Sequence, residues 1–251
     1  MSEFPQTLKT WRKTRRLSQL DLALEAEVSA RHISFLESGR ASPSREMVSR
    51  LGDALQMPLA ARNQMLTNAG FARRFPARAW GDEALAPIAQ AVTRMLRSHA
   101  PFPGIAADSL WRIVEMNDPA AFLFGQLGVG VGDSLLDLML SEHVPQFVEN
   151  WPEVAHHVAG RLRTESAAMG GVATFDRAAQ HLSQQALAEP SEERAVIPTV
   201  FAMGDLRLSL FATIAQFGTP EDVVLDAFKV ELYFPTDAET EAVLRSISAS
   251  T

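Results

Sequence analysis

Apolar residues recur every three or four positions through residues 6–70, which is the spacing of helices that bury one face. Stretches of this kind, separated by turn residues, predict five short helices. We expect the first over residues 6–15, with Leu8 and Trp11 buried. Caps or helix-opening residues stand before the other four stretches, at Ser18, Ser29, Ser44 and Pro58.

The pattern changes after residue 82, where helical stretches are joined by short runs with strand character. Strands are expected at 105–107, 111–114, 198–203, 207–216 and 227–234. Asn117 is placed to open a helix after the second strand. Further helices are expected at 82–98, 133–142, 144–149, 151–169, 175–187 and 237–246, with a polar loop at 189–193. The pattern predicts an α+β protein, in which an all-α five-helix domain precedes an α+β domain with an antiparallel sheet.

The most specific stretch is residues 18–40, SQLDLALEAEVSARHISFLESGR. A small alanine in its first helix allows two helices to cross closely, and apolar residues hold the second helix against the first. The opposite face of that second helix, residues 29–38, is free to enter a DNA major groove. A plain helical bundle would show the same apolar spacing, but packing alone would not require Gln19, Ser29 and Arg40 at these positions.

The stretch resembles the helix-turn-helix of phage repressors, a motif widespread among bacterial transcription regulators, and the resemblance covers residues 7–70. The residues that carry it are Gln19, Leu22, Ala23, Val28, Ser29, Ile33, Leu36, Glu37, Gly39, Arg40, Pro43 and Ser44. The family usually has Gly in the turn, where this chain has Glu27. A residue with a side chain at positive φ costs on the order of 1 kcal/mol, so we expect a slightly strained turn.

Ten residues are expected to form the DNA-binding surface. They are Gln19, Ser29, Ala30, Arg31, His32, Ser34, Phe35, Arg40, Ser44 and Arg45. Arg31 stands early in the recognition helix, where a guanidinium either bridges O6 and N7 of a guanine or contacts phosphate. Gln19 is expected to add a phosphate bond at a helix N-terminus, and Ser29 to act first as a cap. Phe35 either touches a thymine methyl group or packs against the next helix.

Charge is divided unevenly along the chain. The 251 residues have a formal net charge of −7, yet residues 1–79 hold 13 Lys and Arg against 7 Asp and Glu, a net of +6, which leaves −13 for residues 80–251. A basic first part suits a DNA-binding domain, and an acidic remainder discourages non-specific wrapping of DNA. Arg12 and Arg16 are accordingly expected to bind the phosphates of all sequences alike. Charge asymmetry can also serve solubility alone, so it supports DNA binding only in combination with the helix-turn-helix.

Composition narrows the remaining classes of protein. The chain has no cysteine, which excludes disulfides, zinc–thiolate sites and cysteine nucleophiles. It has neither a long apolar run nor a signal peptide, so we expect a bacterial cytoplasmic protein that does not enter a membrane. No GxSxG, Walker or HExxH motif occurs, and adjacent His156 and His157 would point about 100° apart on a helix. No enzyme activity, metal or cofactor is expected.

Nearly the whole chain resembles the MmyB-like transcription regulators, which join an XRE-type helix-turn-helix to a PAS-like ligand-binding domain. The resemblance is carried by residues 35–51, 69–70, 111–125 and 217–244, the last including Pro235, Asp237 and Thr240. It implies a fatty-acid-like or other apolar ligand.

We expect three parts of the chain. These are a helix-turn-helix domain at 1–72, a basic connector at 73–81 that contains Pro76, and a PAS-like ligand-binding and dimerisation domain at 82–251. A PAS fold leaves a hollow between its sheet and its helices, so some of the many aromatic residues are expected to line an apolar pocket. The candidates are Trp111, Phe122, Met139, Phe147, Trp151 and Phe211.

Three functions follow from this organisation. The leading hypothesis is a homodimer that binds a near-palindromic operator in double-stranded DNA in response to a small apolar ligand. In the second, the PAS-like domain serves only dimerisation or partner docking. In the third, the chain is a DNA-tethered enzyme that processes the ligand. An apolar void favours the first and a filled core the second, whereas the third requires polar residues that converge inside the void.

Overall fold

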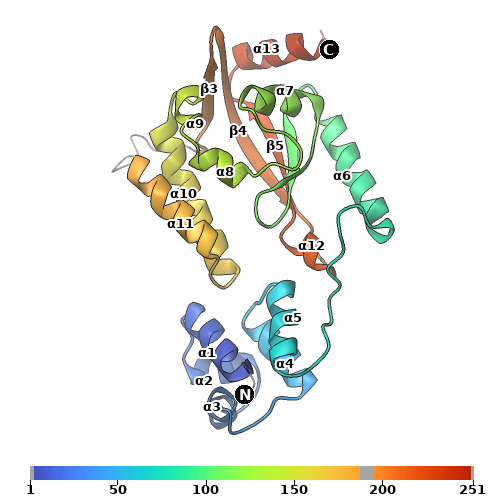
Figure 1. The fold of residues 1–251 in the computed structure, drawn as a ribbon, viewed down its shortest axis with the longest axis vertical. Coiled ribbons are helices and arrows are strands. Elements are labelled where there is room, and N and C mark those ends of the chain that lie inside the picture. The colour runs from blue at the N-terminus through green and yellow to red at the C-terminus, as the bar shows by residue number, and fades with distance from the viewer. Residues whose placement is uncertain (1–2, 187–194, 250–251) are drawn as a thin grey trace. The chain divides into compact units, whose positions relative to one another are not determined.

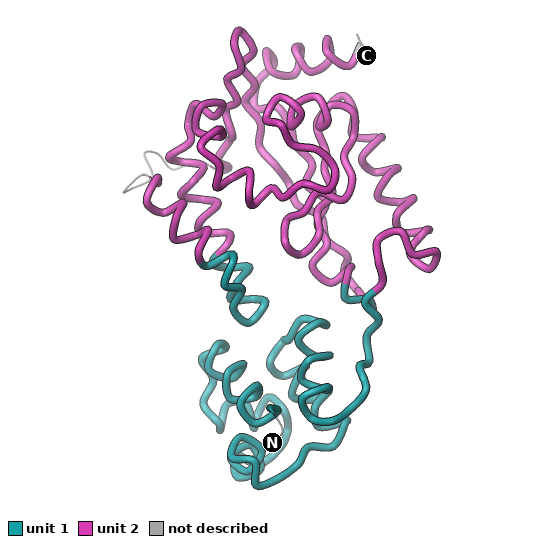
Figure 2. The backbone as a smooth tube through the Cα atoms, in the orientation of Figure 1, with its two compact units in different colours: residues 1–77, 163–176, 221–223 teal, residues 78–162, 177–220, 224–251 magenta. Residues whose placement is uncertain are grey.

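The computed structural model describes residues 3–186 and 195–249 of the chain, and Figure 1 shows its helices and strands. They form two compact units (Figure 2). Unit 1 comprises residues 1–77, 163–176 and 221–223, and unit 2 the remainder. The polar loop expected at 189–193 and the last residue of the helix expected at 175–187 lie outside the described residues. Within the described ranges, no helix is long and apolar enough to cross a membrane.

The first segment of unit 1 folds into the five expected helices. They are α1 (Phe4–Thr14), α2 (Gln19–Glu25), α3 (Ala30–Glu37), α4 (Arg45–Ala54) and α5 (Leu59–Asn68). The first helix begins two residues earlier than the pattern predicts, because Phe4 is buried in the core and Pro5 suits a first helical turn. Leu8, Ile33 and Leu51, from three different helices, are all fully buried in one core cluster.

Three predicted helix caps and the predicted strained turn are confirmed. The hydroxyls of Ser18, Ser29 and Ser44 each accept a hydrogen bond from the backbone N–H three residues on. Ser18 also completes a capping box, because its own N–H donates to the Asp21 carboxylate at 2.8 Å. Glu27, in the turn between α2 and α3, has a φ of 52°. The helix-turn-helix therefore forms with a non-glycine residue in the left-handed region.

The start of the segment expected to act as a connector is bound to α5. Asn63 is 6% exposed, and its Nδ2 donates to the carbonyl oxygen of Phe75 at 2.7 Å. Its Oδ1 accepts from the backbone N–H groups of Arg74 and Phe75. One amide side chain thus satisfies three backbone groups of a segment that has no regular structure.

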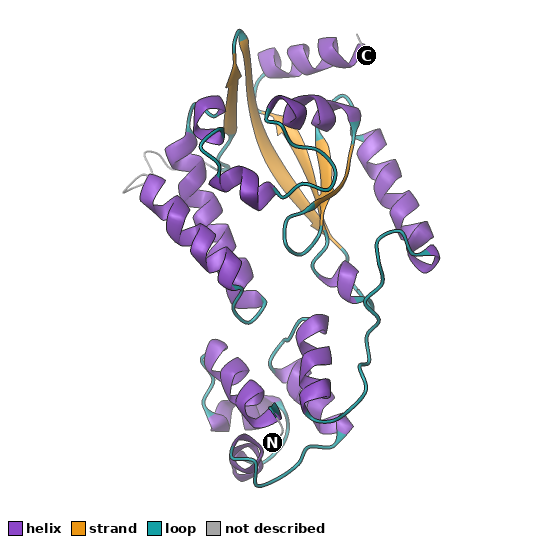
Figure 3. Cartoon of the chain, viewed as in Figure 1, coloured by secondary structure: helices purple, strands orange, loops and turns teal. Residues whose placement is uncertain are grey.

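Unit 2 is built on an antiparallel sheet, shown in orange in Figure 3. Its strands are β1 (Gly104–Ala107), β2 (Ile113–Met116), β3 (Thr199–Met203), β4 (Leu206–Gln216) and β5 (Lys229–Pro235), in the order β2-β1-β5-β4-β3. The predicted α+β fold with an antiparallel sheet is confirmed. The second strand starts later than the pattern predicts, because Trp111 has a φ of 63° and cannot continue a strand.

Helices surround this sheet. They are η1 (Glu83–Leu85), α6 (Ala86–Ser98), α7 (Asp118–Gln126), α8 (Leu135–Leu140), α9 (Val144–Phe147), α10 (Trp151–Ala168), α11 (Ala173–Gln185), α12 (Val223–Asp226) and α13 (Ala238–Ala249). Helices α6 and α7 pack on β1, and α13 packs on β4 and β5. The hairpin of α10 and α11 contributes its tip, residues 163–176, to unit 1. Neither α12 nor this division of the hairpin is predicted by the sequence pattern.

Asn117, which the sequence places at a helix start, joins three elements of unit 2. Its Oδ1 accepts from the backbone N–H groups of Gly104 in β1 and Ala120 in α7. Its Nδ2 donates to the carbonyl oxygens of Leu96 in α6 and Phe102, both at 2.9 Å. The predicted cap is confirmed, and the same side chain also fixes the end of α6 beside the first strand.

The chain end is attached to the sheet by the residues that follow β5. Asp237 caps α13 by accepting from the N–H of Thr240 at 2.7 Å. The hydroxyl of Thr240 in turn accepts from the N–H of Ser209 in β4. These two bonds give a physical role to Asp237 and Thr240, which the sequence pattern marks only as part of a family resemblance.

Candidate DNA interface and ligand cavity

Helix α3, which the sequence predicts to be the recognition helix, presents one buried and one accessible side. Ile33 and Leu36 are fully buried against the other helices. Of the six residues expected to face DNA at this helix, Ser29 and Arg31 are exposed, and the half-buried ones are Ala30, His32, Ser34 and Phe35. The accessible side therefore combines one long cation with small and polar groups, which suits contact with base edges and phosphates.

Arg31 lies over the ring of Phe35, one helical turn further on. The guanidinium carbon is 5.2 Å from the ring centroid, which is the geometry of a cation–π contact. Such stacking uses the face of the guanidinium, so its N–H donors, which lie in the plane, remain available to acceptors such as guanine O6 and N7. Phe35 is half-buried and provides the surface on which Arg31 rests.

Arg12 has a structural role, contrary to the sequence-based expectation that it contacts DNA. Its Nε and Nη2 donate to the two carboxylate oxygens of Glu37, at 2.6 and 2.9 Å, and its Nη1 donates to the carbonyl oxygen of Leu17. The two side chains are only 12% and 4% exposed. This bidentate pair fastens α1 to the end of the recognition helix.

Gln19 belongs to the same network. Its Nε2 donates to Glu37 at 2.8 Å, so one of its two amide hydrogens is already used inside the protein. Burial opposes ionisation of Glu37, but the hydrogen bonds from Arg12 and Gln19 outweigh it and lower the pKa of the carboxyl. Gln19 therefore has one donor left for the phosphate contact expected from the sequence.

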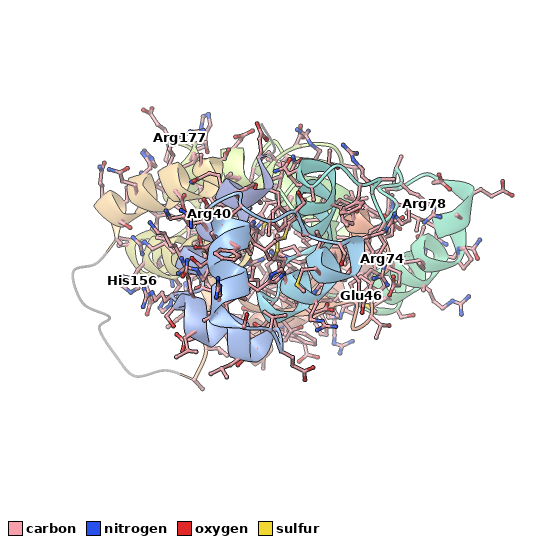
Figure 4. All side chains as sticks on the ribbon, turned by 90° about the horizontal axis from the view of Figure 1, so that it is seen from below. Arg40, Glu46, Arg74, Arg78, His156 and Arg177 are labelled. Carbon is pink, nitrogen blue, oxygen red and sulfur yellow. The ribbon has the colours of Figure 1, made fainter. Side chains whose placement is uncertain are left out.

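The other residues expected at the DNA surface are Arg40, Ser44 and Arg45, and all three are exposed. Arg40 stands three residues after the last residue of α3 and is labelled in Figure 4. The hydroxyl of Ser44 caps α4 through the N–H of Met47 at 3.1 Å. Arg16, expected to bind phosphates, is also exposed, with a φ of 57°. Exposed arginines therefore both precede and follow α3 along the chain.

A cavity of about 130 Å³ lies in unit 2, and the side chains around it come from α7 to α10 and from β3 to β5. Its walls are mainly apolar, with Phe124, Leu138 and Val158 among the lining residues. Three of the six residues expected to line a pocket do so: Trp111, Met139 and Trp151. A void of this kind gives an apolar ligand a place that a filled core would not.

The three other expected pocket residues lie elsewhere. Phe122 is 39% exposed on α7, and Phe147 is half-buried on α9 without lining the cavity. Phe211 stacks on Phe234 with ring centroids 5.6 Å apart. Its neighbour Ala212 does line the cavity, because successive residues of a strand point to opposite faces of the sheet. The sequence identified the right strand and the wrong face.

One end of the cavity is polar, and sequence reasoning missed it. Arg161 of α10 forms an ion pair with Glu231 of β5, and the hydroxyl of Tyr233 donates to the same carboxylate at 3.1 Å. Burial, followed by the charge of Glu231, raises the pKa of Tyr233 well above its usual value, so its hydroxyl stays protonated as a donor. The signal is present in the sequence, since Lys229, Glu231 and Tyr233 alternate with the apolar residues of β5.

Trp111 brings this polar end together. The guanidinium carbon of Arg161 is 4.3 Å from its ring centroid, and Nζ of Lys229 is 5.8 Å away. Its backbone is held in the left-handed region by a turn in which Asp108 accepts from the N–H groups of Leu110 and Arg112. A residue with a large side chain keeps such a conformation only where its surroundings require it. Here the turn directs the indole to the cavity.

Polar side chains converge at the cavity, as the enzyme hypothesis requires, and they include Arg161, Glu231 and Tyr233. His156 and His157 are both exposed, with ring centroids 5.3 Å apart. Within the described ranges, no group of three or more His, Cys, Asp or Glu side chains could hold a metal ion. The polar groups at the cavity form an ion pair and a hydrogen bond, which are suited to recognising or responding to a ligand.

Comparison with known families assigns both parts of the chain. Residues 88–247 match a family model described as the MmyB-like transcription regulator ligand binding domain, and residues 8–61 match one described as helix-turn-helix. No curated protein matches the chain. The two matches support a DNA-binding transcription regulator with a separate ligand-binding domain, and domains of these kinds are generally non-enzymatic.

Proposed function

The chain belongs to the MmyB-like transcription regulators. From that premise we propose that it binds a specific operator, and that its affinity for this operator changes when a small apolar ligand binds in unit 2. The observation that carries this proposal is the largely apolar cavity with one polar end, beside Trp111. The order of the sheet, with the first two strands beside the last, supports a PAS-like domain.

DNA recognition is assigned to residues 29–38 and the basic residues on either side. The accessible side of α3, with Arg31 resting on Phe35, is the part that enters the major groove. One such helix reads only a few base pairs, so the functional form is a homodimer on two half-sites. If light scattering at micromolar concentration gave the mass of one chain, both with and without operator, this result would contradict the dimer.

The ligand is expected to be small and mostly apolar, such as a short fatty acid or a similar molecule with one polar group, because the cavity has a volume of only about 130 Å³. The apolar walls would take its chain, and the Arg161–Glu231–Tyr233 end would take its polar group. The first test is mass spectrometry of small molecules released when the purified protein is denatured. The second is a panel of fatty acids, acyl-CoAs and aromatic acids, scored by melting temperature and by affinity for an operator selected from random duplexes.

A cavity-filling variant makes this test specific. Val158→Trp should fill the space and abolish both the ligand-induced rise in melting temperature and the change in operator affinity. Ala121→Trp is the control, since Ala121 is exposed on α7 and does not line the cavity. A ligand at 100 times its Kd adds about 2.7 kcal/mol to stability, which is readily measured.

The alternative is a regulator whose second domain serves only dimerisation or partner docking. It predicts that none of the compounds changes melting temperature or operator affinity, and that Val158→Trp affects DNA binding no more than Ala121→Trp does. That result would replace ligand sensing by docking and would leave DNA recognition untouched.

A further inference from the structure

Helix α10 belongs to both units. Up to residue 162 it is part of unit 2, and from residue 163 it is part of unit 1. In unit 2 it lines the cavity with Trp151, Val154, Val158 and Arg161, a spacing of three and four residues that keeps one helical face on the cavity. A continuous helix transmits a displacement of one end to the other, since its internal hydrogen bonds resist bending.

The end of α10 in unit 2 is held by the Arg161–Glu231 ion pair, which we call the cavity ion pair. It joins α10 to β5, and both residues line the cavity. The side chain of Glu231 is 8% exposed and that of Arg161 is 27% exposed. A ligand whose polar group approaches Arg161 therefore competes with Glu231, which keeps the hydrogen bond from Tyr233.

The other end of α10 is held by α1, within unit 1. Arg15 donates to the carbonyl oxygens of Ala167 and Ala168, at 3.1 and 3.0 Å. These carbonyls are in the last turn of the helix, where the usual N–H partners four residues on are missing, and that of Ala167 also accepts from the N–H of Gly170 at 3.3 Å. The same guanidinium donates to the carbonyl oxygens of Leu55 and Gln56, so it also fastens the end of α4.

An aromatic contact completes this attachment. A Cβ atom added to Gly170 would lie only 2.3 Å from Cζ2 of Trp11, so the indole packs on a backbone position that only glycine allows. Gly171 has a similar positive φ, 101° against 87°, yet an added Cβ there meets nothing within 4 Å. Trp11 and Arg15 with residues 167–170 are here called the α1–α10 contact.

We propose that α10 transmits the state of the cavity to the recognition helix. This inference rests on the proposed function, because it describes how ligand binding changes DNA affinity. When a ligand weakens the cavity ion pair, α10 shifts and carries α1 with it through the α1–α10 contact. Arg12 of α1 holds Glu37 at the end of α3, so the displacement reaches the helix that reads DNA.

Hydrogen exchange tests this without a known ligand or operator, on the full-length protein. Glu231→Gln removes the cavity ion pair and should change exchange of the backbone amides in residues 8–15 and 163–172 by about fivefold or more. Glu149→Gln is the matched control in unit 2, since Glu149 forms an ion pair with Arg207 that is exposed on both sides. It should change the same amides by less than about twofold.

Substitutions at Gly170 and Gly171 test whether the response passes through the α1–α10 contact. Gly170→Ala should abolish the effect of Glu231→Gln on residues 8–15, because the added methyl group displaces Trp11. Gly171→Ala imposes a similar backbone strain without that clash and should leave the effect intact. If Gly170→Ala does not fold, Arg15→Lys, which cannot reach the same set of carbonyls, replaces it.

An equal response of residues 8–15 with and without Gly170→Ala would overturn transmission through this contact. No response to Glu231→Gln in any background would overturn it as well. The outcomes are independent of the ligand panel: lack of any ligand defeats the proposed function, whereas lack of an exchange response defeats transmission by α10 alone.

Discussion

Two ion pairs of this protein, Arg12–Glu37 and Arg161–Glu231, use the same residue types in different surroundings. In unit 1, Arg12 binds both oxygens of Glu37, and Gln19 donates to the same carboxylate. In unit 2, Arg161 and Glu231 border a cavity. Close packing leaves no competitor for the first pair, whereas the second can exchange partners with whatever enters. On the proposed function, the space around an ion pair, more than its chemistry, decides whether the pair supports the fold or responds to a ligand.

The largest effect is expected from breaking the unit 1 pair. Arg12→Ala leaves the Glu37 carboxylate, 4% exposed, without its cation. We expect a loss of about 3–5 kcal/mol in the free energy of unfolding, as for other buried pairs that lose one partner. Urea unfolding followed by circular dichroism measures it, and Arg50→Ala, whose pair with Glu46 is exposed, should cost less than about 1 kcal/mol. Similar losses in the two variants would disprove a structural role for Arg12.

A smaller effect is expected from replacing Arg31, which is proposed to contact DNA and to contribute little to stability. Arg31→Ala should weaken the preferred operator by roughly 1–3 kcal/mol and relax sequence choice at one base pair. Because Arg31 is exposed, the urea midpoint should stay unchanged. Fluorescence anisotropy with the preferred duplex and single-base variants measures both terms. If the affinity for every variant fell equally, Arg31 would be a phosphate contact.

The smallest effect is expected from acid. The pKa of Glu37 is lowered by Arg12 and Gln19, so the folded state favours the carboxylate. Stability from this group is present above the ordinary value of about 4.3 and is lost as pH falls through the lower folded-state pKa. Unfolding measured from pH 6 down to pH 3 should therefore show less acid sensitivity in Glu37→Gln. Identical pH profiles for the two proteins would show that Glu37 does not titrate differently on folding.

The sequence predicts most of the fold because its signals are local. Caps such as Ser18 and Asn117, the apolar spacing of the helices, and the apolar and polar residues that alternate over 206–210 act within a few residues of chain. The positive φ of Glu27 follows equally from the position of the turn. Element boundaries shifted where a tertiary contact decided them, as at Phe4, whose burial extends α1.

The candidate site was predicted only in part, because its determinants are distant in sequence. Arg12 and Glu37 are 25 residues apart and Arg161 and Glu231 are 70 apart, and no local pattern pairs them. Aromatic content indicated a pocket but not which face of β4 borders it, so Phe211 was expected where Ala212 lies. A buried charge on one strand, such as Glu231, implies a partner that only the fold reveals.

Asn117 has a consequence for how far the sequence can vary. Its amide offers two acceptor bonds and two donor bonds, and all four go to backbone groups of different segments. Aspartate would supply no donor, and glutamine would place its amide one methylene too far. A saturation library selected for folded protein should return asparagine almost alone at position 117, while the exposed neighbour Asp118 admits many residues.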